Sequence, residues 1–209
     1  MNFGGYNWDR ASSGAGIGTF GSKYISCTSS GYLQLGIANS GGTVYSSEID
    51  GQQAMGYGTY TIVVQGPIAL NSYAVLGLFT WDGNSGTASN GYREIDAEIV
   101  GPSAAPGWFS SSNQNSDFVS QWTNNDQTST EQDYGMTYTG DVKYQIVWKS
   151  GTTSFTVSQA STGTVLDSWS GPSYTSPGQA SFIMNLWDWS KAVTGSSNVV
   201  IKSFSFTPS

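Results

Sequence analysis

Apolar and polar residues alternate with a period of two over many short segments of this 209-residue chain. In residues 31–39, Leu33, Leu35 and Ile37 alternate with polar or small residues, which predicts a β-strand with one buried face. Gly, Ser and Asn residues separate this segment from others that alternate in the same way or are apolar throughout. Those segments are 45–50, 56–64, 75–83, 91–100, 118–124, 180–189 and 199–206.

Residues 142–149 and 153–157 predict a β-hairpin whose turn contains Ser150 and Gly151. Tyr144 and Trp148 are expected to pack in the core. The chain has no sequence repeats, linkers or long helical segments. These observations predict one all-β domain over residues 1–209, built as a β-sandwich.

Three segments predict loops because they are rich in Gly, Pro, Ser, Asn or other polar residues. They are 12–18, 101–117 and 124–133. The first is rich in glycine, yet no hydrophobic strand precedes it and no helical pattern follows, so it is not a dinucleotide-binding fingerprint. We interpret it as a flexible turn.

The segment 91–100 concentrates carboxylates on one face of a predicted strand. Glu94, Asp96 and Glu98 alternate with aliphatic residues that should face the core. Only 14 of the 209 residues are acidic, and three of them fall within these five positions. Because like charges on one face repel, at least one of these carboxyl groups should have a raised pKa.

Three interpretations fit this row of acids. A catalytic pair would use one ionised and one protonated carboxyl group, as glycoside hydrolysis requires. Alternatively, the row is a solvated polar face of an edge strand, or the three acids form a cation site. The spacing alone does not choose among the three.

Composition excludes several other functions. The net charge is −7 and Lys plus Arg total seven, so nucleic-acid binding is not expected. The chain contains no histidine, which removes Ser-His-Asp and Cys-His catalysis and the commonest zinc ligand. Acid–base chemistry must therefore rest on carboxyl groups or tyrosines.

Cys27 is the single cysteine, so no internal disulfide can form, and we expect a buried, unreactive thiol. No apolar run of 18 residues is present, so we expect no membrane-spanning segment. Residues 1–3 lack the features of a signal peptide. Either a signal peptide has been removed and a start codon added or the protein is intracellular, and we favour the first.

The run from Glu94 to Glu98 resembles the Glu-x-Asp-x-Glu signature of glycoside hydrolase family 16, the lichenase and laminarinase family. The resemblance implies that Glu94 is the nucleophile and Glu98 the general acid/base, while Asp96 holds or tunes the nucleophile. It also implies a jelly-roll, concanavalin A-like β-sandwich with a substrate cleft on its concave face. For residues 12–18 it offers the rim of this cleft as the alternative to a flexible turn.

Flanking segments extend the resemblance over most of residues 31–206. The segment 184–187, Met-Asn-Leu-Trp, is similar to a lichenase motif, and 57–60 is similar to the family's Tyr-Gly-x-Tyr strand. The sequence departs from lichenases at Asp50, where they typically carry Arg, and at position 92, where they usually present Trp. The substrate-binding residues that the resemblance implies are Glu48, Tyr92, Gln121, Trp122, Trp187 and Trp189.

Several of these residues have alternative interpretations. Glu48 could be a surface carboxylate at a strand end, and Trp187 could be a core aromatic residue. Gln121 and Trp122 are neighbours on a strand, so at most one of them should face the cleft. Arg93 should face away from Glu94 and serve a structural or surface role.

The resemblance implies a retaining endo-β-glucanase acting on β-1,3 or mixed β-1,3/1,4 glucan. A non-catalytic glycan-binding sandwich, or another activity of the family such as agarase, carrageenase or transglycosylase, are the alternatives. We expect a secreted monomer with a polysaccharide substrate, no cofactor, and no nucleic-acid or membrane partner. The family often binds calcium, but no matching acidic ligand is found here, so no metal is predicted.

Overall fold

The computed structural model describes residues 1–14, 18–82, 93–102, 139–173, 176–190 and 192–209, and the backbone of three strands between 116 and 135. The strands are β1 Asn2–Phe3, β2 Tyr6–Arg10, β3 Thr19–Phe20, β4 Ile25–Cys27, β5 Leu33–Ser40, β6 Thr43–Ala54, β7 Gly58–Val64, β8 Ala74–Trp81, β9 Ile95–Val100, β10 Ser116–Thr123, β11 Asp126–Thr128, β12 Tyr134–Gly135, β13 Val142–Lys149, β14 Thr152–Gln159, β15 Val165–Gly171, β16 Ser181–Asp188 and β17 Ser196–Pro208. A 3₁₀ turn, η1 (Ser22–Tyr24), is the one helical element of this described part.

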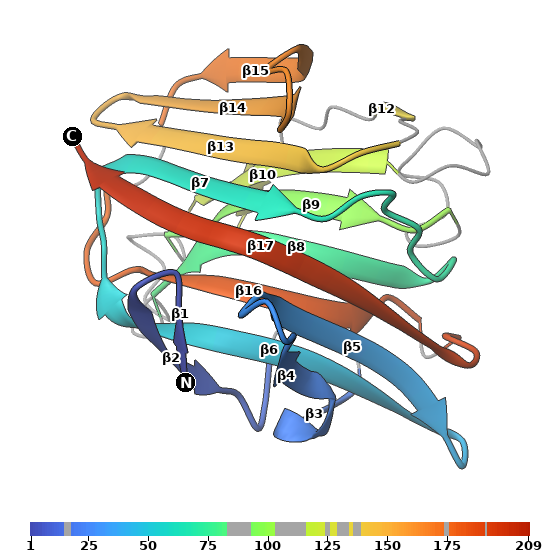
Figure 1. Ribbon diagram of the computed structural model, residues 1–209. Coiled ribbons are helices and arrows are strands. Elements are labelled where there is room, and N and C mark those ends of the chain that lie inside the picture. The colour runs from blue at the N-terminus through green and yellow to red at the C-terminus, as the bar shows by residue number, and fades with distance from the viewer. Residues whose placement is uncertain are drawn as a thin grey trace.

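The strands form a sandwich of two antiparallel sheets. One, which we call the site sheet, has the order β2-β6-β16-β8-β9-β10. The other, the back sheet, has the order β15-β14-β13-β7-β17-β5-β4. In Figure 1, β7, β13 and β17 of the back sheet pass in front of β8, β9 and β10. The fold is therefore the predicted all-β sandwich.

Strand β6 belongs to both sheets. Its first residues, Thr43 to Tyr45, pair with β5 of the back sheet. Further along, residues 47–54 pair with β16 and residues 49–51 pair with β2 in the site sheet. A single strand thus continues from one layer into the other.

The core lies between the two sheets, and alternation along each strand decides which residues enter it. On β9, Ile95, Ala97 and Ile99 are all buried in this core, as the sequence predicts. The back sheet contributes Tyr60 of β7 and Ile146 of β13 to the same cluster. Burying one face of β9 leaves its other residues, including the acids, to face outward.

The predicted hairpin is confirmed: β13 and β14 pair from Val142 opposite Gln159 to Lys149 opposite Thr152. Tyr144 and Trp148 are buried in the core, as expected. The tract 124–133, which the sequence predicts to be a loop, contains the short strand β11 paired with β10. The polar composition of this tract gave no signal of alternation from which the strand could be predicted.

The expectation of a buried Cys27 is wrong, because this thiol is exposed. Cys27 is the last residue of β4, a three-residue strand at the edge of the back sheet. The chain then turns, with the Gly31 N–H donating to the Thr28 carbonyl, so the strand ends before a further residue can enter the core. In the described part of the chain, no helix is long and apolar enough to cross a membrane.

Candidate active site

Outward-facing residues of the site sheet lie in rows that cross the strands. One row is set by the pairing of Asp50 with Ile183, of Ile183 with Phe79 and of Phe79 with Asp96. Residues paired in this way share one face of a sheet. The central acid of the β9 row therefore lies in line with an acid of β6, with two apolar residues between them.

The adjacent row contains Glu48, Asn185, Gly77 and Glu98. Asn185 Nδ2 donates to Glu48 Oε2 at 2.9 Å, and Asn185 Oδ1 accepts from the Gly77 N–H at 3.2 Å. A Cβ at Gly77 would lie 2.5 Å from Asn185 Oδ1, so glycine leaves room for the amide. This amide holds the Glu48 carboxylate in a fixed position on the face that also carries Glu98.

The N-terminal loop covers Glu48. A Cβ at Gly14 would come within 2.7 Å of both carboxylate oxygens, so the loop backbone lies directly against this side chain. Glu48 is only 3% exposed, in the middle of β6, and is not a surface carboxylate at a strand end. Of the two interpretations of residues 12–18, the position of Ser13 and Gly14 supports a cleft rim.

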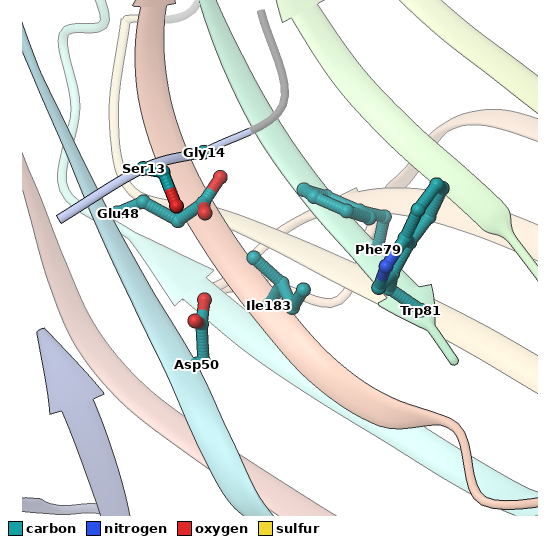
Figure 2. Close-up of a pocket in the computed structure, with 7 residues that line it drawn as sticks. All are labelled: Ser13, Gly14, Glu48, Asp50, Phe79, Trp81 and Ile183. Carbon is teal, nitrogen blue, oxygen red and sulfur yellow. The ribbon is translucent and has the colours of Figure 1, made fainter. Parts of the chain in front are cut away.

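A cleft of about 380 Å³ opens between this loop and β8. In Figure 2, the Glu48 carboxylate lies beside the loop, Asp50 follows it along β6, and Phe79 and Trp81 form the opposite wall. Its lining thus combines acids on one side with aromatic rings on the other, which suits a sugar. The described residues that line it are Ser13, Gly14, Glu48, Asp50, Phe79, Trp81 and Ile183.

The three acids at β9 lie in a desolvated environment. Asp96 is buried, while Glu94 and Glu98 are partly buried. Burial raises the pKa of Glu94, and the charges of Asp96 and Glu98 and a side-chain hydrogen bond with Asp96 raise it further. Burial, followed by the charge of Asp96, also raises the pKa of Glu98. The row of acids is therefore not a solvated polar face. Its environment favours the protonated forms of Glu94 and Glu98 at neutral pH.

Asp50 carries a second perturbed carboxyl group on the cleft floor. Burial, followed by the charge of Asp9 opposite it on β2, raises its pKa to about 6. Its Oδ1 atom is buried and has no hydrogen-bond partner among the described residues. Asp9 in turn accepts a hydrogen bond from Gln52 Nε2 at 2.7 Å. The residue that departs from the lichenase pattern thus lines the cleft and carries one buried oxygen without a hydrogen-bond partner in the described part of the chain.

Trp187 and Trp189 pack against each other, with ring centroids 5.5 Å apart. They form a small cluster with Val75 and Val100 and are partly exposed. Trp187 pairs with Val75 two residues along β16 from Asn185, so it lies on the outward face and is not a core residue. The two rings form a continuous aromatic surface on the same face as the acids.

The other predicted substrate-binding residues are only partly described. Gln121 pairs through its backbone with Ile95, and Trp122 with Gln127, so both belong to β10 beside β9. Their side chains lie outside the described residues, as does all of Tyr92. Among the residues that the structure describes, no group of three or more His, Cys, Asp or Glu could hold a metal ion.

Sequence reasoning did not single out Phe79, Trp81 or Asn185 as site residues. A signal for the first two was available, since Phe79, Trp81 and Gly77 share one parity on a predicted strand. Asn185 could have been found from its parity with Trp187. None of these signals shows that β8 pairs with β9 or that β16 pairs with β8, because both pairings depend on the topology.

The fold is that of the jelly-roll β-sandwich structures of glycoside hydrolase family 16. The match with a β-glucanase of Bacillus licheniformis has a TM-score of 0.72 and 20% identity and covers 99% of this chain and 95% of that one. A lichenase derived from a mouse hindgut metagenome gives a TM-score of 0.69 and 19% identity over 97% and 93% of the two chains. Laminarinase from Flavobacterium sp. gives 0.70 and 14% over 96% and 92%.

A more distant match is the kappa-carrageenase of Pseudoalteromonas carrageenovora, with a TM-score of 0.61 and 10% identity over 96% of this chain and 89% of that one. No family model and no curated protein matches the sequence. At these identities the likeness establishes the fold.

Proposed function

We propose that this protein is a retaining endo-β-glucanase of glycoside hydrolase family 16, acting on β-1,3 or mixed β-1,3/1,4 glucan. The observation that carries the proposal is the row of three acids at β9, on the face that also forms an aromatic-walled cleft, where burial and neighbouring charges raise the pKa of Glu94 and Glu98. The solved structures of the same fold include a lichenase and a laminarinase, which supports the choice of substrate. We further propose a secreted, single-domain monomer.

In the first step, Glu94 attacks the anomeric carbon while Glu98 transfers its proton to the glycosidic oxygen. The bond between that carbon and oxygen breaks, and an ester between the sugar and Glu94 forms. A raised pKa suits Glu98 to this step, because the general acid must hold a proton until the leaving group needs it. The departing chain leaves with the proton.

Glu94 must be ionised to attack, although its pKa is raised. The hydrogen bond between Glu94 and Asp96 provides a solution, because the two carboxyl groups can share one proton. When the proton resides on Asp96, Glu94 is a carboxylate that still accepts a hydrogen bond. Asp96 thus tunes the nucleophile.

In the second step, Glu98, now a carboxylate, removes a proton from water, and the resulting oxygen attacks the same anomeric carbon. The ester bond breaks, Glu94 is released, and the anomeric configuration is retained after two inversions. Glu48, held by Asn185, and Asp50 would accept hydrogen bonds from sugar hydroxyls on the β6 side of the cleft. Phe79 and Trp81 would stack against sugar faces.

One observation favours a second candidate, a glycan-binding sandwich without efficient catalysis. If the proton shared by Glu94 and Asp96 stays on Glu94, the nucleophile is neutral and cannot attack. Binding of a glycan by the cleft would then remain. Affinity electrophoresis in glucan gels that shows retardation without new reducing ends would favour this candidate.

The test is release of reducing sugars from laminarin, barley glucan, galactans, xyloglucan and carrageenan. We expect the wild type to cleave laminarin or barley glucan, and Glu94→Gln to lose about 10⁴-fold or more in kcat while remaining folded. Asp167→Asn on β15 of the back sheet is the matched control and should keep wild-type turnover. Undiminished hydrolysis by Glu94→Gln would contradict the proposed mechanism. Cleavage of carrageenan, a sulfated galactan, and of no other polysaccharide would contradict the proposed glucan substrate.

A further inference from the structure

The backbone immediately before Glu94 has an unusual conformation. Arg93 has φ of 49°, and it is the one non-glycine residue with positive φ in the described part of the chain. This left-handed conformation is strained for a residue with a Cβ. The regular pairing of β8 with β9 ends at Thr80 and Ile95, one residue short of Glu94. The register of the sheet therefore does not fix the direction of this glutamate.

The side chain of Thr80 continues the pairing where the strands stop. Its hydroxyl donates to the Arg93 carbonyl at 2.7 Å and accepts from the Ile95 N–H at 3.2 Å. These two backbone groups belong to the residues on either side of Glu94. Thr80 is completely buried, so water does not compete for either hydrogen bond.

The Arg93 side chain is anchored as well. Its Nη1 pairs with Asp82 Oδ2 at 2.5 Å, and the Asp82 side chain is buried at 3% exposure while that of Arg93 is partly buried at 14%. The same Asp82 oxygen accepts from the Gln179 N–H at 3.1 Å. A Cβ at Gly178 would overlap Arg93 Nε, so the segment before β16 closes tightly over the guanidinium group.

The contacts of Arg93 are not expected to stabilise the fold much by themselves. Arg93 Nε is buried and makes no hydrogen bond among the described residues. A buried ion pair with an unmade hydrogen bond often adds little to stability, and the strained φ subtracts from it. What the anchored residues share is that they hold the chain on either side of Glu94.

We propose that Thr80, supported by the Arg93–Asp82 ion pair, is a positioning device that keeps the Glu94 carboxyl group directed at the reacting sugar carbon beside Asp96. The inference rests on the proposed role of Glu94 as the nucleophile. Positioning matters at this residue because a one-residue slip in a strand turns a side chain to the opposite face. A misplacement of about 1 Å can cost about 100-fold in rate.

The test compares Thr80→Val, which keeps the shape and removes both hydrogen bonds, with Thr80→Ser, which keeps the hydroxyl. We expect kcat on the best glucan to fall about 100-fold in the valine variant, with KM within about twofold. The serine variant should stay within about threefold of the wild type. The acidic limb of the kcat/KM–pH profile, which reports the free enzyme's groups, should shift only in the valine variant.

A matched control separates positioning from stability. Thr153 of β14 is equally buried but belongs to the back sheet. Thr153→Val should lower Tm and leave kcat and the pH profile of the folded protein unchanged. If Thr80→Val behaves like Thr153→Val, the inference is overturned.

Asp82→Asn provides a second measurement should Thr80→Val fail to fold. It removes the ion pair but can still accept from the Gln179 N–H, and we expect a loss of about tenfold in kcat. Wild-type kcat in this variant would also overturn the inference. Glu94→Gln distinguishes the two failures: if it is active, the proposed function fails, and if it is inactive while Thr80→Val or Asp82→Asn is unimpaired, only the positioning role fails.

Discussion

The two sheets of the sandwich differ in how they surround their outward-facing side chains. On β13 of the back sheet, buried residues alternate with half-buried ones along the strand. On β8 of the site sheet, every residue from Ala74 to Thr80 is buried, whichever face it is on. On β8 the outward-facing side chains are thus buried as well as the core-facing ones. A charged group there loses water that a similar group on the back sheet keeps.

Carboxyl groups of the two regions illustrate the effect of this difference. Asp141, beside β13, accepts from Lys202 Nζ at 2.7 Å, and this hydrogen bond lowers its pKa below the ordinary value. At Glu94 and Glu98, by contrast, burial and the charge of Asp96 raise the pKa of both. The same functional group thus favours its charged form beside the back sheet and its protonated form on the site sheet. Four predictions test this contrast.

The largest effect should come from Glu98→Gln. Loss of the general acid should reduce kcat on glucan by about 10³-fold, because the leaving oxygen no longer receives a proton. An aryl glucoside with a good leaving group, such as 2,4-dinitrophenolate, needs little protonation, so formation of the glycosyl-enzyme should be much less impaired. The measurement is the pre-steady-state burst of dinitrophenolate. Equal losses on both substrates would argue against this role for Glu98.

The next largest effect is expected from Gly77→Ala. The new Cβ would displace the Asn185 amide and disturb its hydrogen bond to Glu48. We expect about 2 kcal/mol of lost stability, as for overpacking in a core, and a raised KM. Urea unfolding and steady-state kinetics measure the two effects. Gly21→Ala is the control, since a Cβ there meets nothing within 4 Å and should change neither. An unchanged Gly77→Ala variant would mean that the outward face is not tightly packed.

Asp50→Asn tests the cost of charge on the cleft floor. Its pKa is about 6 in the folded protein against an ordinary 3.8, so the fold favours the protonated form. That contribution is complete below pH 3.8 and is lost as the pH rises through 6. The asparagine variant, which is never charged, should therefore raise Tm by about 2–4 °C at pH 8 and by little at pH 4. A Tm gain that does not depend on pH would contradict the assignment.

Asp141→Asn should give the smallest effect and the opposite pH dependence. A lowered pKa means that the ionised form stabilises the fold above pH 3.8, and that this contribution is lost as the pH falls through the folded-state value. Because the ion pair with Lys202 is partly exposed, Tm should fall by only about 1 °C at pH 8. At acidic pH the difference should disappear, which differential scanning calorimetry can follow. A larger loss at pH 4 than at pH 8 would contradict the contrast between the sheets.

Local alternation was sufficient to predict much of the fold and the direction of Asp96 and Glu98 on β9. The two-residue period in 91–100 assigns Ile95 and Ile99 to the core and leaves the carboxylates on the other face, as the structure has them. Patterns of this kind depend only on neighbouring residues along the strand. The pKa of Glu94 is raised, as expected for at least one of the acids, but burial is the main cause and the repulsion that the spacing predicts comes second.

Contacts between distant segments could not be predicted in this way. Nothing near Thr80 in the sequence indicates that its hydroxyl bonds to the residues on both sides of Glu94. The burial of Glu48 likewise depends on a loop that is distant in the sequence, around Gly14. The exposure of Cys27 depends on where a short edge strand ends, which composition does not reveal. These features depend on topology, and topology is a long-range property.

The pairing of β6 in both sheets has a consequence for how the protein unfolds. The strand carries Glu48 and Asp50 in one layer, and its first three residues are paired in the other. Heat or denaturant cannot unfold the site sheet as an independent unit without also breaking hydrogen bonds of the back sheet. Loss of activity and loss of the buried tryptophan signal should therefore coincide in a single melting transition.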